Sequence, residues 1–89
     1  MKEGKFMTKE DIFSIIKKCF SEIMPDIPVE NIRIEDSLRD LGANSIDRAS
    51  IIINAMESLK IFIPMVKFGN ARNIKDIVEI LHLASGKSI

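Results

Sequence analysis

The hexapeptide GANSID, Gly42–Asp47, stands just before the most apolar stretch of the chain. Asn44 is a favoured N-cap residue, and Asp47 follows it at the third helical position. The pattern therefore predicts a helix that begins at about Ser45 and ends at about Lys60. It also raises a question about the serine. Either Ser45 belongs only to the helix start, or its hydroxyl is displayed there for modification.

This predicted helix is apolar on more than one side. One ordinary buried stripe consists of Ala49, Ile52, Met56 and Leu59. Further apolar residues extend that surface around most of the helix: Ile46, Ile51, Ile53 and Ala55. Such a helix lies at the centre of a bundle, docks against a partner, or does both.

Apolar residues also recur at helical spacing near the beginning of the chain, which predicts a helix over about Thr8–Ile23. Thr8 can cap this helix, with Asp11 three residues later, and Pro25 and Pro28 end it. Its buried stripe consists of Ile12, Ile16, Cys19, Phe20 and Ile23. Cys19 therefore belongs to the predicted core.

The rest of the chain predicts one more long helix and several short turns. Residues 24–43 carry loop signals, with one helical turn over Asp36–Gly42, and a second short turn falls within Met65–Arg72. A helix capped by Asn73 and ending near Leu83 follows. Apolar anchors along the loop suggest that it is pinned across the core: Ile27, Val29, Ile32, Ile34, Leu38 and Leu41. The expected fold is an all-α bundle of three longer helices, a short third helix and a long pinned loop.

Composition excludes several kinds of function. The chain has 89 residues, 46% hydrophobic and 29% charged, which fits one small globular domain. Thirteen basic and 13 acidic residues leave no net charge, which argues against nucleic acid as a partner. The single cysteine, Cys19, excludes an internal disulfide, and no metal-ligand spacing occurs. No apolar run could cross a bilayer, and a single cysteine fits a reducing compartment, so we expect a cytoplasmic protein without a membrane segment. We also expect it to be a monomer.

The chemistry open to Ser45 follows from its place at a helix start. Free backbone N–H groups and the positive end of the helix dipole favour a phosphate there. A nucleophilic serine would instead need a base, and the chain has one histidine, His82, near the end of the last helix. With no third orienting group evident, a catalytic pair is disfavoured, and His82 is expected to be solvated near a helix C-terminus.

Four ordered segments together resemble an acyl carrier protein. They are Asp36-Ser37-Leu38, Leu41–Asp47, Ile61-Phe62-Ile63-Pro64 and Asn73–Ile77. The family pattern is a leucine-glycine turn, an acid, the modified serine and an apolar residue, then a helix of fixed length and an apolar-Ile-Pro turn. The likeness covers nearly the whole chain. It implies a carrier domain at residues 8–83, flanked by a flexible N-terminus at 1–7 and a flexible tail at 84–89.

The resemblance implies a non-catalytic carrier with 4′-phosphopantetheine attached to Ser45 by a phosphopantetheinyl transferase. The arm holds acyl groups as thioesters, Asn44 and Ile46 flank its base, and the helix after Ser45 is the main docking surface. On that helix the expected docking residues are Asp47, Arg48, Ser50, Ile53, Asn54 and Glu57.

GANSIDRA followed by a long apolar helix is similar to free-standing polyketide carriers that help install β-branches, as in antibiotic biosynthesis. The implied partners are an acyltransferase, a decarboxylating ketosynthase-like enzyme and a hydroxymethylglutaryl-synthase-like enzyme. The acyl load would be malonyl, decarboxylated to acetyl and then donated.

Two departures from the family pattern affect this interpretation. Asn44 replaces the usual acid before the serine, and Arg48 and Lys60 balance Asp47 and Glu57 on the helix. Partners that dock through a basic patch would gain little attraction, which argues against housekeeping fatty-acid synthesis. Two alternatives stay open: a peptidyl or aminoacyl carrier of non-ribosomal peptide synthesis, and an unmodified helical interaction module in which Ser45 only caps.

Overall fold

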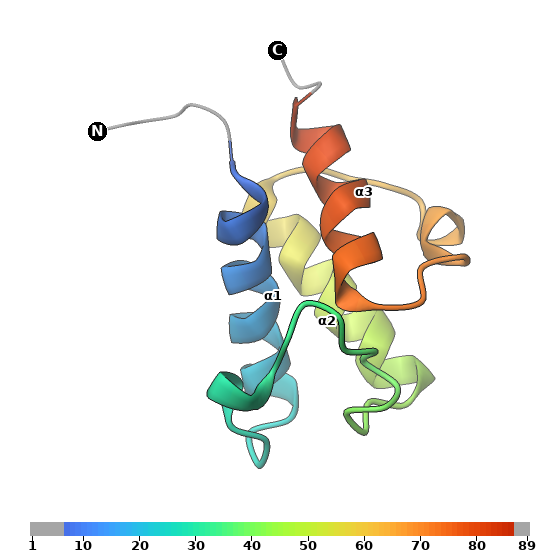
Figure 1. Ribbon diagram of the computed structural model, residues 1–89. Helices are drawn as coiled ribbons and strands as arrows, with labels where there is room; N and C mark the ends of the chain where they lie inside the picture. Colours follow the sequence, from blue (N-terminus) through green and yellow to red (C-terminus); the bar gives the residue numbers. More distant parts are fainter. Residues whose placement is uncertain (1–6, 87–89) are drawn as a thin grey trace.

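The computed structural model describes residues 7–86, which form three α-helices and two short 3-10 turns (Figure 1). The helices are α1 (Lys9–Ile23), α2 (Ser45–Leu59) and α3 (Ile74–Gly86), and the turns are Val29–Asn31 and Met65–Phe68. No strand occurs in this part of the chain. The predicted all-α bundle is confirmed, with the short third helix present as the 3-10 turn Met65–Phe68.

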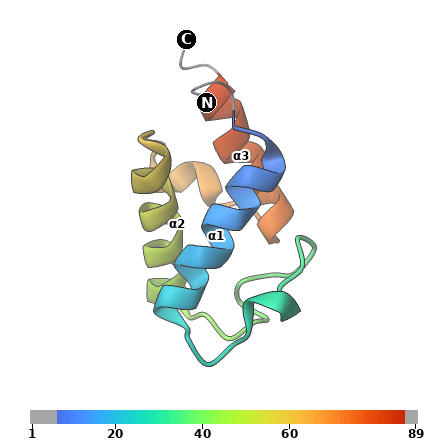
Figure 2. The ribbon, with the colours of Figure 1, turned by 90° about the vertical axis from the view of Figure 1, so that its left-hand side faces the viewer.

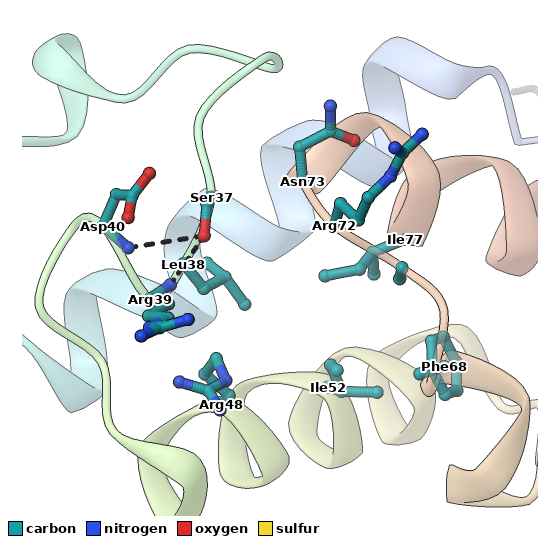
Figure 3. A pocket seen from close by; sticks show the side chains of 11 residues that line it. Ser37, Leu38, Arg39, Asp40, Arg48, Ile52, Phe68, Arg72, Asn73 and Ile77 are labelled. Atoms are coloured by element: carbon teal, nitrogen blue, oxygen red, sulfur yellow. Dashed lines mark hydrogen bonds between the residues drawn. The ribbon is translucent and has the colours of Figure 1, made fainter.

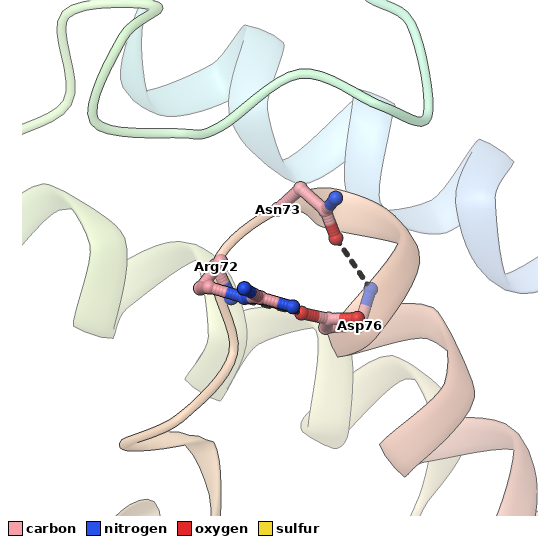
Figure 4. Close-up of polar contacts among 3 residues, drawn as sticks. All are labelled: Arg72, Asn73 and Asp76. Atoms are coloured by element: carbon pink, nitrogen blue, oxygen red, sulfur yellow. Dashed lines mark hydrogen bonds and ion pairs between the residues drawn. The ribbon is translucent and has the colours of Figure 1, made fainter.

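Side-chain caps fix where the helices begin. Thr8 Oγ1 accepts the N–H of Asp11 at 3.0 Å, and Asp11 Oδ2 accepts the N–H of Thr8 at 3.2 Å. At the start of α3, Asn73 Oδ1 accepts the N–H of Asp76 at 2.9 Å (Figure 4). Asp76 Oδ2 also accepts the N–H of Arg72 at 3.0 Å. Each cap satisfies N–H groups that have no acceptor within the helix, so the predicted starts are confirmed.

The core forms where α1 packs against both α2 and α3. Figure 2 shows α1 between α2 on one side and α3 on the other. α2 and α3 contact each other far less extensively than either contacts α1. The core residues with no exposed surface are Ile12, Phe20, Ile51, Ala55, Ile74, Val78 and Leu81. In a domain of this size, nearly every large apolar side chain is needed for a stable core.

The buried side of α2 differs from the predicted stripe. The buried residues are Ile51, Ile52, Ala55 and Met56. Ala49 and Leu59 are only half-buried, so two of the four predicted positions were wrong. Because apolar residues surround most of this helix, periodicity could not select the row that α1 covers.

The loop over residues 24–43 is pinned by some of its apolar residues, as predicted. Ile32 and Leu38 are buried in the core, while Ile27, Ile34 and Leu41 are half-buried against it. The prediction for Val29 was wrong, because this residue lies in a 3-10 turn that the sequence did not predict and is 39% exposed.

Backbone hydrogen bonds attach the same loop to the start of α3. The N–H of Ile74 donates to the carbonyl of Asp36, and the N–H of Lys75 donates to that of Ile34, both at 2.8 Å. The loop therefore satisfies two N–H groups that α3 cannot pair internally. This attachment positions the chain that leads to Ser45.

Two predicted boundaries differ from the structure. α3 runs to Gly86, three residues beyond Leu83, where the sequence predicted a tail; there the Ser85 hydroxyl donates to the carbonyl of His82 at 3.0 Å. Met7, assigned to a flexible terminus, is half-buried and packs against the core. The remaining terminal positions, 1–6 and 87–89, lie outside the described residues.

Candidate functional site

The chain enters α2 through a tight turn. The hydroxyl of Ser37 accepts the N–H of Arg39 at 3.1 Å and so starts the turn. Gly42 ends it: its N–H donates to the carbonyl of Arg39, and the N–H of Ala43 donates to that of Leu38, both at 3.0 Å. These two bonds form a Schellman motif, with buried Leu38 and Ala43 in its apolar positions. Gly42 has φ +107°, a conformation that side-chain-bearing residues rarely adopt.

The first turn of α2 is held by reciprocal hydrogen bonds. Asn44 Oδ1 accepts the N–H of Asp47 at 2.8 Å, and Asp47 Oδ2 accepts the N–H of Asn44 at 3.4 Å. Arg48 adds a second clamp, since its Nη1 donates to the carbonyl of Ala43 at 2.9 Å. Asn44 therefore acts as the cap, which leaves the next residue free of that role.

Ser45 is the first helical residue and is exposed. Its hydroxyl has no hydrogen-bond partner among residues 7–86. The N–H groups of Ser45 and Ile46 have no intrahelical acceptor, as at any helix start. Arg48 lies one turn further along the same side of the helix. An exposed hydroxyl beside free N–H groups and a guanidinium is a suitable place for a phosphate ester.

Side chains that could make Ser45 a catalytic nucleophile lie elsewhere. His82 is near the C-terminal end of α3, at the opposite end of the bundle from the start of α2 (Figure 1). Cys19 is buried on α1; burial raises the pKa of its thiol, and the Glu22 carboxylate raises it further. Within residues 7–86, no group of histidine, cysteine and acidic side chains could hold a metal ion.

Comparison with known proteins assigns the family. A family model for the phosphopantetheine attachment site matches residues 14–81. The chain belongs to that family. It is an acyl carrier protein, of the kind to which 4′-phosphopantetheine is attached through a serine. No helix in the described residues is long and apolar enough to cross a membrane.

Two relatives show which carriers this chain is similar to. It is 34% identical over 76 residues to the polyketide biosynthesis acyl-carrier-protein AcpK of Bacillus subtilis (strain 168), covering 85% of this chain and 93% of that protein. A solved structure of the curacin biosynthetic pathway HMG synthase in complex with its acetyl donor-ACP also matches. That match has a TM-score of 0.80 and 36% identity, and it covers 86% of this chain and 99% of the matched one.

The residues expected to dock partners are not equally accessible. Ile53 and Glu57 are exposed, whereas Asp47, Arg48, Ser50 and Asn54 are half-buried. Asp47 and Arg48 also hold the helix start through the bonds described above. These two residues therefore have a structural role whether or not they contact a partner.

Sequence reasoning missed an exposed apolar group just after α2. Phe62 and Val66 are 83% and 82% exposed, and Met65 lies beside them at 39%. Ile46, next to Ser45, is 76% exposed. The signal was present in the sequence, because the stretch between α2 and Gly69 holds more large apolar residues than a four-residue turn can bury.

Proposed function

We propose that Ser45 is the serine that carries 4′-phosphopantetheine and that the chain donates an acetyl unit during β-branching of a polyketide. The observation that carries the first part is the free, exposed Ser45 hydroxyl at a capped helix start. The family match supports it, because the matched segment includes this position. The second part is supported by the two relatives, one a polyketide carrier and one an acetyl donor.

The attachment chemistry needs an accessible oxygen and stabilisation of negative charge. A phosphopantetheinyl transferase, with coenzyme A and Mg²⁺, would direct Ser45 Oγ at the phosphorus that bears pantetheine. An O–P bond forms, the bond to adenosine 3′,5′-bisphosphate breaks, and the hydroxyl proton leaves to a base of the transferase. The N–H groups at the start of α2 and the Arg48 guanidinium stabilise the resulting phosphodiester. When attached, the group supplies a terminal thiol that holds the acyl chain as a thioester.

In this scheme the chain itself catalyses nothing and is a substrate of its partners. An acyltransferase loads malonyl, a ketosynthase-like enzyme removes carbon dioxide to leave acetyl, and a hydroxymethylglutaryl-synthase-like enzyme takes the acetyl group. Ile53 and Glu57 on α2, with Asn44 and Ile46 beside Ser45, are exposed to such partners. We place the protein in the cytoplasm, because its one cysteine, Cys19, is a free thiol and fits a reducing compartment.

Intact-protein mass spectrometry tests the attachment site. The chain is incubated with coenzyme A, Mg²⁺ and a broad-specificity phosphopantetheinyl transferase. We expect the mass of one phosphopantetheine to be added to the parent chain and none to Ser45→Ala. Ser14→Ala, which removes an exposed serine of α1, serves as the matched control and should be modified normally. No modification of well-folded parent chain would favour the helical interaction module instead.

A loading assay tests the acetyl-donor role. The acetyl-loaded chain is mixed with a β-branching synthase of the hydroxymethylglutaryl-synthase class, and acetyl loss from the carrier is followed by mass. We expect transfer from this chain and little from a fatty-acid carrier loaded in the same way. Loading by an amino-acid-adenylating enzyme, without transfer to the synthase, would show a peptidyl carrier.

A further inference from the structure

A stretch of chain without acidic residues begins where α2 ends. Residues 58–75 contain no aspartate or glutamate, although the whole chain has 13 acidic and 13 basic residues. Four exposed cations lie in this stretch: Lys60, Lys67, Arg72 and Lys75. A chain with no net charge therefore has one segment whose charges are all positive.

The fold leaves this positive charge largely unpaired. Lys60, Lys67 and Lys75 form no ion pair among residues 7–86. Arg72 Nε lies 4.0 Å from Asp76 Oδ2, but the Arg72 side chain is 89% exposed, so this pair contributes little to stability. The cations of the segment are therefore available to another molecule.

Three large apolar side chains lie among these cations. Phe62 and Val66 are 83% and 82% exposed, and Met65 is 39% exposed. None of the three belongs to the buried core or to the side chains packed against it. Single exposed apolar residues are common on protein surfaces, but three within residues 62–66 form a group. Because the core does not use these side chains, their grouping indicates a contact surface.

Buried neighbours fix the backbone that carries this apolar group. Ile63 and Phe68 are both buried. Figure 3 shows Phe68 on the side of its turn that faces Ile52 of α2. The N–H of Ile63 donates to Met56 Sδ at 3.2 Å, which attaches the segment to α2. The turn Met65–Phe68 stands out beside α3 in Figure 1, so the apolar group is presented on a defined part of the surface.

The apolar group and the exposed lysine on either side of it in the sequence make up a basic apolar surface: Lys60, Phe62, Met65, Val66 and Lys67. We propose that this surface docks the enzyme that takes acetyl from the carrier, and that the enzyme meets it with an apolar depression bordered by carboxylates. The inference rests on the proposed function, which supplies the partner. The apolar side chains enter the depression and leave water. The lysines pair with carboxylates at the edge, which speeds the encounter.

Two other occupants fit these features less well. A twofold contact between copies would pair each positive surface with itself, and like charges oppose such an association. A lipid surface is bound by a helix with a long apolar face, whereas Met65–Phe68 is one 3-10 turn of four residues. A protein depression needs only a few well-placed side chains, because a handful of contacts supplies most of the binding energy.

The kinetics of acetyl transfer test this docking surface. The acetyl-loaded chain is titrated against a synthase of the hydroxymethylglutaryl-synthase class, and KM for the carrier is separated from kcat. We expect Phe62→Ser to raise KM about tenfold, as for loss of a central apolar contact, and to leave kcat unchanged because the arm is intact. Phe62→Leu, which keeps an apolar side chain, should restore most of the affinity.

A matched pair of valines controls for the loss of apolar surface in general. Val66→Ser should raise KM several-fold. Val29→Ser removes an exposed valine from the other 3-10 turn, outside the basic apolar surface, and should leave KM unchanged. Circular dichroism confirms that each variant is folded before its kinetics are compared.

Charge reversal tests the chemistry of the partner. Lys60→Glu/Lys67→Glu should raise KM several-fold at low salt, and the difference should shrink as salt screens the charges. Lys18→Glu/Arg33→Glu is the control, because it changes the net charge equally at exposed residues elsewhere, and it should have little effect. KM of the parent chain should rise with salt.

Several results would overturn this inference and leave the proposed function in place. Unchanged KM in Phe62→Ser and Val66→Ser would show that the synthase docks elsewhere. A lower KM after charge reversal would show that the partner surface is basic. Binding to phosphatidylserine vesicles, or a dimer in sedimentation, that is lost in Phe62→Ser while KM stays unchanged would identify a lipid surface or a second copy as the occupant. Absence of acetyl transfer from the loaded parent chain would overturn the proposed function and this inference together.

Discussion

Replacement of Asn44 tests how the chain keeps its attachment helix in place without the acid usual before the modified serine. Asn44 Oδ1 accepts the N–H of Asp47 at 2.8 Å, and Asn44→Ala removes that acceptor. Loss of such a cap costs about 1 kcal/mol. Asn44→Asp keeps an oxygen at the same place and adds negative charge at the positive end of α2. That charge is worth about 0.3–1 kcal/mol.

The two substitutions should therefore move the stability of the unmodified chain in opposite directions. For a domain of this size, 1 kcal/mol corresponds to about 4–8 °C in the unfolding midpoint. Thermal unfolding followed by circular dichroism should show a decrease of that order for Asn44→Ala and a smaller increase for Asn44→Asp. Asn70→Ala is the control, because Asn70 is exposed and no hydrogen bond of its side chain occurs among the described residues.

Attachment of the arm should reduce the benefit of Asn44→Asp. A phosphodiester on the adjacent residue puts two negative charges about 5 Å apart, which costs about 0.8 kcal/mol in water. The increase in midpoint should therefore shrink to near zero in the modified chain, most clearly at low salt. If Asn44→Asp lowered the midpoint of the unmodified chain as much as Asn44→Ala does, the capping argument would be refuted. An equal benefit before and after attachment would refute the placement of the phosphate.

Three further predictions concern the frame around the site. Gly42→Ala should destabilise the chain by about 1 kcal/mol in urea unfolding, because a residue with a side chain is strained at φ +107°. Space is not the cause, since the added Cβ would meet only Met24 Cε, at an ordinary contact distance of 3.5 Å. An unchanged urea midpoint would contradict this prediction. Lys60→Gly should stabilise the chain by roughly 0.5 kcal/mol, because Lys60 caps the end of α2 with φ 60°, a conformation that glycine adopts without strain. A lower thermal midpoint would show that the positive charge of Lys60 at the helix end contributes more than the relief of that strain. Burial raises the pKa of Cys19 above its ordinary value of 9.0, so its contribution to stability is complete below that pH and is lost as pH rises through the folded-state pKa. Unfolding free energies from pH 8 upward should therefore fall more steeply for the parent chain than for Cys19→Ala, and parallel curves would refute the role of the thiol.

Much of the fold could be predicted because its signals are local. The caps at Thr8, Asn44 and Asn73 each depend on one side chain and an N–H group three residues later. Such contacts are set by sequence spacing, so the helix starts were predicted correctly. The loop anchors were predicted less well: Ile32 and Leu38 are buried, but Val29 is not. Whether an apolar loop residue reaches the core depends on the path of the whole loop, which spacing does not record.

The candidate site likewise has features that the sequence predicts and features that it does not. The place of Ser45 after a capping residue follows from the hexapeptide alone. The accessibility of the expected docking residues does not follow from it. Ser50 and Asn54 are half-buried, and burial depends on how the rest of the chain packs against α2. The exposed Phe62 and Val66 were missed for a related reason: apolar character alone does not show which face of a short turn meets solvent.

The sequence by itself determined three helices, their caps and the position of the serine, since each rests on interactions within about four residues. Only the tertiary structure decided which row of α2 is buried and which loop residues reach the core. The carbonyl groups of Ile34 and Asp36 accept the N–H groups of Lys75 and Ile74, which lie far away in the sequence. Spacing does not predict these contacts, because they require the packing of the core to bring the loop and the start of α3 together. Side chains distant in sequence become neighbours only when the core has fixed the helices relative to one another.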